Sequence, residues 1–90
     1  MPAYQVNYDL RKPGRDYEPL WERLKTWNAV RALESCWIVP RASSAIALRD
    51  DLSQYMDSND GLLVTGMTGE SAWRWISASA EAVLRQGIAA

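Results

Sequence analysis

The sequence predicts a single α+β domain over residues 1–90, with the element order β-α-β-β-α-β and an additional C-terminal helix. Two patterns predict this class. Apolar and polar residues alternate near the start of the chain, as in a strand, and three later stretches repeat apolar residues every three or four positions, as in helices. In addition, no linker, repeat or low-complexity stretch divides the chain. A domain of this size buries only about 60% of the surface that its unfolded chain exposes, so a partner chain would add stability.

The first strand is expected over residues 3–9, where three apolar side chains alternate with three polar ones. The dipeptide Pro13-Gly14 predicts a turn after it. Asp16 is suited to cap the helix that follows, and Pro19 falls in the first helical turn, where proline is tolerated. The apolar stripe of this helix has the spacing i, i+3, i+4, i+7 and i+10: Tyr17, Leu20, Trp21, Leu24 and Trp27.

Residues 30–39 form an extended apolar stretch that ends at Pro40. The predicted element order requires two strands in this segment, yet no Gly or Asn-Gly turn divides it. Either one long bent strand runs through residues 30–42, or a bulge near Ser35 splits the segment into a hairpin. The residues leave both alternatives open.

The second helix is expected to be capped by Ser43 or Ser44. Residues 57–61 predict its stop and a turn, and residues 62–65 predict a short buried strand. Its inward positions are Ala45, Leu48, Leu52, Tyr55 and Met56. The element order up to this point is that of a ferredoxin-like fold.

A third helix is expected to open at residues 68–70, with Gly87 as a plausible stop. The apolar residues at helical spacing are Ala72, Trp73, Ile76, Ala80, Val83 and Leu84.

The composition limits the chemistry. Histidine is absent, which removes the commonest general base, the imidazole metal ligand and every Ser-His or Cys-His nucleophile pair. A single cysteine cannot form an internal disulfide, and no stretch resembles a membrane span or a signal peptide. We therefore expect a cytoplasmic protein with no membrane partner.

Charge is unevenly distributed along the chain. The net charge is −1, whereas nucleic-acid binding usually calls for a basic surface. Residues 1–49 hold eight Lys or Arg against five Asp or Glu, and residues 50–90 hold two against six. Such a molecule could bind phosphate on one side, or meet its partner with opposite charges.

Asp9 ends the first strand, just before a loop that contains Arg11, Lys12 and Arg15. A carboxylate at a strand end can hold Mg²⁺ beside a phosphodiester while guanidinium groups neutralise the phosphate. One carboxylate is a poor magnesium site, but a two-fold axis could bring two copies of Asp9 together. The alternative is that Asp9 accepts backbone hydrogen bonds in the following turn.

Other candidates lie later in the chain. Arg31 could contact phosphate or stabilise an interface, but on its own it is more simply explained as a solvated residue at the strand edge. Trp37 and Cys36 alternate across their strand and are expected to pack in the core. Trp73 and Trp75 cannot face the same way on a helix, so we expect Trp75 to be exposed, as tryptophans at binding surfaces often are.

The segment Tyr8-Asp9-Leu10, together with 31–37 (Arg31-Ala32-Leu33-Glu34-Ser35-Cys36-Trp37), resembles the small CRISPR-associated adaptation protein. The resemblance implies a ferredoxin-like homodimer with paired Asp9 residues as a metal site. The other positions that match the pattern of this family are Tyr8, Arg31, Ser35 and Trp37. VapD-type ribonuclease toxins share this architecture. A closer resemblance, over essentially the whole chain, is to bacterial proteins labelled SinR-like, although no helix-turn-helix pattern is present here.

Two hypotheses follow. The first is a homodimeric nucleic-acid-associated protein, with Mg²⁺-dependent endoribonuclease or endodeoxyribonuclease activity as its catalytic form. In this hypothesis Asp9 is the catalytic metal ligand, and Arg11, Lys12, Arg15 and Arg31 bind nucleic acid. The second is a non-catalytic protein-protein interaction module on the same dimeric fold. The expected interface residues are Tyr8, Ser35, Trp37 and Trp75.

Overall fold

The computed structural model describes residues 3–68 and 70–86, which form a four-stranded antiparallel sheet and three helices. The strands are β1 (Tyr4–Asp9), β2 (Val30–Leu33), β3 (Cys36–Val39) and β4 (Gly61–Gly66). Their order in the sheet is β2-β3-β1-β4, and each neighbouring pair is antiparallel. The chain is therefore a small α+β protein.

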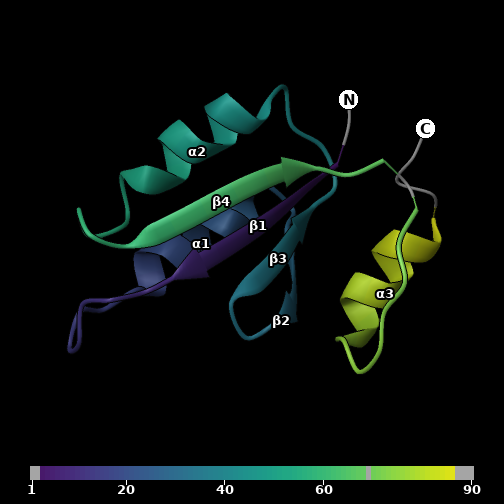
Figure 1. Cartoon of the computed structure of the whole chain (residues 1–90), viewed down its shortest axis with the longest axis horizontal. Helices are drawn as coiled ribbons and strands as arrows, with labels where there is room; N and C mark the ends of the chain where they lie inside the picture. Colours follow the sequence, from purple (N-terminus) through teal and green to yellow (C-terminus); the bar gives the residue numbers. More distant parts are fainter. Residues whose placement is uncertain (1–2, 69, 87–90) are drawn as a thin grey trace.

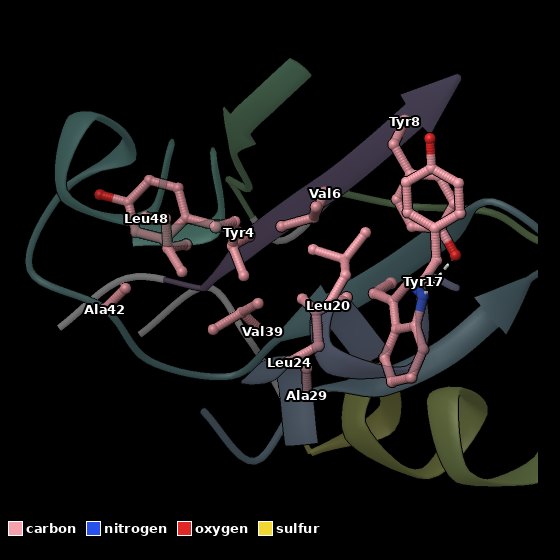
Figure 2. Close-up of a cluster of buried hydrophobic side chains, with 12 residues drawn as sticks. Tyr4, Val6, Tyr8, Tyr17, Leu20, Leu24, Ala29, Val39, Ala42 and Leu48 are labelled. Carbon is pink, nitrogen blue, oxygen red and sulfur yellow. Dashed lines mark hydrogen bonds between the residues drawn. The ribbon is translucent and has the colours of Figure 1, made fainter. Parts of the chain in front are cut away.

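The two faces of the sheet are covered differently. The helices α1 (Glu18–Thr26) and α2 (Ala45–Ser53) pack on one face, where Leu20, Leu24, Leu48 and Leu52 are fully buried. Figure 2 shows Val6 and Val39 of the sheet lying against the α1 leucines, with Tyr4 beside Leu48. This cluster is the main core, and it follows directly from the alternation in β1 and the apolar stripe of α1.

The third helix, α3 (Ala78–Arg85), lies beside β2 and β3, apart from the other two helices (Figure 1). A second apolar cluster forms there from Ala32, Cys36, Ile38 and Ala80. Because residues in a strand alternate between faces, Trp37 and Val39 belong to the main core while Cys36 and Ile38 face α3.

The alternative of a hairpin over residues 30–42 is the one observed. Glu34 and Ser35 form the turn between β2 and β3, and the register shift lies between Arg31 and Leu33 rather than at Ser35. Ser44 caps α2 through its Oγ, which accepts a hydrogen bond from the Ala47 N–H at 3.0 Å.

The predicted cap of α1 is wrong by one residue. Tyr17 is the N-cap, and its side chain makes no capping hydrogen bond. Asp16 still accepts a hydrogen bond from the Glu18 N–H at 2.9 Å, so its carboxylate satisfies one of the first N–H groups of the helix from one position further out.

The predicted start of the third helix is also wrong. Residues 70–77 are not helical, and Trp75 has a left-handed backbone with φ of 60°. The helix begins only after Ser77, whose Oγ accepts from the Ala80 N–H at 3.2 Å. Ile76 therefore packs against the second apolar cluster from the connection before α3. An apolar residue is needed at this position although it is not helical, and the sequence pattern could not distinguish the two. Gly69 and Gly87 lie outside the described residues.

Candidate functional site

A pocket of about 510 Å³ opens where the end of β1 meets the β2–β3 turn and α1. Its lining comes from segments far apart in the sequence: Tyr8, Asp9, Leu10, Trp21, Arg31, Glu34 and Ser35. Four of these, Tyr8, Asp9, Arg31 and Ser35, are residues that the sequence singled out. The fold therefore brings these four into one place, whereas the other predicted residues are not part of the lining: Arg11, Lys12, Arg15, Trp37 and Trp75.

Tyr8 is one of the lining residues, and its hydroxyl is surrounded by hydrogen-bond donors. Its Oη accepts from Trp21 Nε1 at 3.1 Å, from Trp37 Nε1 at 3.1 Å and from Arg31 Nη2 at 2.9 Å. The Tyr8 hydroxyl itself donates to the Glu34 carbonyl oxygen at 3.3 Å. The dashed line in Figure 2 marks the bond from Trp37, which joins this polar centre to the main core.

Arg31 is held by aromatic rings as well as by Tyr8. Its guanidinium carbon lies 5.0 Å from the centre of the Trp21 ring and 5.1 Å from that of Trp37. A cation over an aromatic face within about 6 Å is attracted by the ring quadrupole. Arg31 is nonetheless an exposed residue that lines the pocket. Its guanidinium is therefore restrained by these neighbours and still accessible to a ligand.

Asp9 stands at the rim with its side chain 71% exposed. Its Oδ2 accepts from Arg11 Nε at 3.0 Å, and Arg11 Nη1 donates to the Asn59 carbonyl oxygen at 3.1 Å. Gly61 makes room for this arrangement, because a Cβ there would lie 3.1 Å from Arg11 Nη2. Asp9 is thus an exposed partner of Arg11 within its own chain.

The predicted basic loop is partly neutralised. Arg15 pairs with Asp57 at 3.6 Å, just as Arg11 pairs with Asp9, which leaves Lys12 without a salt bridge among the described residues. The loop is anchored by Asp60, whose carboxylate accepts from the Arg11 N–H at 2.6 Å and from the Tyr17 hydroxyl at 2.7 Å.

These hydrogen bonds also affect titration. Burial raises the pKa of Asp60, but the hydrogen bonds from the Arg11 N–H, the Tyr17 hydroxyl and the Asp57 N–H outweigh it, and the pKa is lowered overall. Burial and the bond to Asp60 raise the pKa of Tyr17. Asp60 is thus a structural carboxylate that sequence reasoning missed, although its place in a turn-forming run was visible.

The donor set of one chain does not fit Mg²⁺. Hard cations are usually bound by several oxygen ligands, often more than one carboxylate. Within residues 3–68 and 70–86, no three Asp, Glu, His or Cys side chains gather in one place. Asp9 offers a single carboxylate that already accepts from Arg11. A metal site at Asp9 would need ligands from a second molecule.

The four predicted interface residues lie in different environments. Tyr8 and Trp37 are buried in the core of their own chain, at 9% and 4% exposure. Ser35 is exposed at the rim of the pocket. Trp75 is 86% exposed, as expected, although it projects from a connection and not from a helix.

Comparison with known proteins adds no assignment. No protein-family model matches the sequence, and no solved structure matches the fold. Among the helices that the structure describes, none is long and apolar enough to cross a membrane.

Proposed function

We propose that this chain is a homodimeric, nucleic-acid-associated protein of ferredoxin-like architecture that binds its ligand at the pocket around Arg31. The strand order β2-β3-β1-β4, antiparallel throughout, supports the architecture, since α1 and α2 share one face of the sheet. The resemblance to the CRISPR-associated adaptation protein and to SinR-like proteins is part of this proposal, as is a cytoplasmic location.

The observation that carries the proposal is the fixed guanidinium of Arg31 in an open pocket. Arginine is well suited to nucleic acid because its planar group donates several hydrogen bonds and stacks on flat surfaces. Here one donor is used by Tyr8, and the two tryptophan rings restrict the remaining motion. A donor fixed before binding loses less conformational entropy when the ligand arrives.

Binding can be measured as the fluorescence anisotropy of labelled RNA and DNA strands. We expect Arg31→Gln to weaken binding by roughly tenfold or more, on the scale of one lost charged contact. Arg41→Gln is the matched control, because Arg41 is exposed and lies outside the pocket lining. Equal binding by the wild type and Arg31→Gln would contradict the proposal.

Dimerisation and Mg²⁺ belong together in this proposal. Light scattering should give about twice the 10.2 kDa chain mass. Nuclease activity is proposed only for such a dimer, in which a second Asp9 would add the missing carboxylate. Millimolar Mg²⁺ should then raise the melting temperature of the wild type and leave that of Asp9→Asn unchanged. A monomer, or a wild-type melt that does not respond to Mg²⁺, would remove the metal from the proposal.

The exposed apolar side chains favour a second candidate, the protein-protein interaction module. Trp75 and Leu63 are 86% and 62% exposed, and β4 is an edge strand of the sheet. Large exposed aromatic residues are common at the centres of protein interfaces. If no RNA or DNA strand binds, with or without Mg²⁺, this candidate becomes the better one.

A further inference from the structure

The Tyr8 hydroxyl beside the Arg31 pocket has more N–H donors around it than it can accept from. A phenol oxygen has two lone pairs, yet three N–H groups point at Tyr8 Oη. The two indole groups have one N–H each and lie on tryptophans of the core and its edge, whereas Arg31 has further donors and is exposed. Arg31 is therefore the group that can keep its bond to Tyr8 through Nη2 and still offer its other N–H groups to a ligand.

The rim of the same pocket is acidic. Asp9 and Glu34 both line it, and both are exposed. Asp9 is paired with Arg11, whereas the Glu34 carboxylate and the Arg31 guanidinium form no salt bridge among the described residues. A phosphate group would place a further negative charge in a pocket whose lining already includes the unpaired carboxylate of Glu34, which is unfavourable. A neutral group that offers both acceptors and donors avoids this repulsion.

We infer that the pocket receives an unpaired nucleobase, with guanine preferred, so that the ligand is single-stranded nucleic acid. The inference rests on the proposed function and names its ligand class. Guanine presents two acceptors, O6 and N7, to one guanidinium, and its N1–H and N2–H groups are donors that a carboxylate accepts. The pocket volume of 510 Å³ is within the range of sites that take such a ligand.

A base in a duplex is stacked and paired, so it cannot enter a pocket of this kind without leaving the helix. Phosphates along the same strand would lie outside the pocket, and Lys12 follows the lining residue Leu10 by two positions on the adjacent loop. In this arrangement Arg31 and Glu34 determine the base, and the loop contributes attraction that does not depend on sequence.

The test compares three labelled oligonucleotides of one length by anisotropy: a guanine-containing single strand, its duplex, and the same strand with abasic sites in place of guanine. We expect the intact single strand to bind at least roughly tenfold more tightly than the other two, the scale of one good base contact. Guanosine should compete with the bound strand more effectively than adenosine, cytidine or inorganic phosphate.

The variant Glu34→Gln should reduce the preference for guanosine and keep the strand bound, because it removes the charged acceptor but not Arg31. Glu18→Gln is its control, since Glu18 is an exposed carboxylate on α1 outside the pocket lining. Equal binding of the intact strand, the duplex and the abasic strand would overturn the inference and leave the proposed function standing. Competition by inorganic phosphate that is as effective as competition by guanosine would also overturn the inference. Failure of all three oligonucleotides to bind would overturn both.

Discussion

Replacing Tyr8 by Phe tests the polar centre on which the site depends. The change removes one oxygen and keeps the ring, so packing is nearly unchanged. It leaves Trp21 Nε1, Trp37 Nε1 and Arg31 Nη2 without their acceptor. Trp37 is only 4% exposed, so water cannot easily replace the lost oxygen there.

The cost is the sum of one unsatisfied buried donor and two weakened bonds. A buried donor without a partner costs about 1–3 kcal/mol, and a typical hydrogen bond contributes about 1 kcal/mol. Trp21 and Arg31 line the pocket, so their N–H groups can donate to water instead. Each therefore contributes less to the loss of stability than Trp37 does. We expect Tyr8→Phe to lower the free energy of unfolding by about 2–4 kcal/mol. In a domain of this size that is a fall in Tm of at least about 10 °C.

Urea denaturation of Tyr8→Phe and Tyr4→Phe measures this effect with a matched control. Tyr4 lies on the same strand and is equally buried, at 8% exposure, but its hydroxyl makes no hydrogen bond to the described side chains or backbone. Tyr4→Phe should therefore change stability by less than about 1 kcal/mol. If the two variants unfold at the same urea concentration, the Tyr8 hydroxyl does not hold the centre together.

Three further predictions concern other parts of the chain. The Arg23 guanidinium lowers the pKa of Asp51, so the stability that this carboxylate supplies is present above its unfolded pKa and is lost as pH falls through the folded one. Urea midpoints of Asp51→Asn should therefore fall below wild type at pH 7 and approach it near pH 3, with exposed Asp50→Asn unchanged as the control. Ser77→Ala should cost about 1 kcal/mol and speed amide exchange in α3 but not in β1, and equal exchange of α3 in the variant and the wild type would exclude a capping role. Lys12→Glu should weaken nucleic-acid binding and reduce its salt dependence without changing the melt, whereas an unaltered salt slope would place the phosphates elsewhere.

The elements that the sequence predicted well are those with one strong periodic signal. The alternation in β1 and the stripe of α1 locate those elements to within a residue or two. The turn at Glu34 and Ser35 carries no glycine, so a hairpin could not be separated from a bent strand. The start of α3 was misplaced because apolar spacing alone does not distinguish a helix from a connection that covers the sheet.

The sequence named four of the seven residues that line the candidate site, but not how they are arranged. Tyr8, Asp9, Arg31 and Ser35 were named, yet nothing in their spacing indicates that one hydroxyl would gather two indoles and a guanidinium. The helical register assigned Trp21 to the core, and its ring does pack there. The register does not show that the Nε1–H of the same ring donates to Tyr8. Hydrogen-bond geometry of this kind depends on the packing of α1 against β2 and β3, which a sequence pattern does not contain.

The uneven charge along the chain illustrates the same limit. Basic residues of the first half and acidic residues of the second suggested two oppositely charged sides. In the structure they meet within the molecule: Arg23 with Asp51, and Arg15 with Asp57. These two pairs join the β1–α1 loop to the turn before β4 and α1 to α2, so part of the charge asymmetry in the sequence is neutralised in space. The argument for nucleic acid therefore rests on the single fixed guanidinium of Arg31, whose nearest acceptor is a hydroxyl and not a carboxylate.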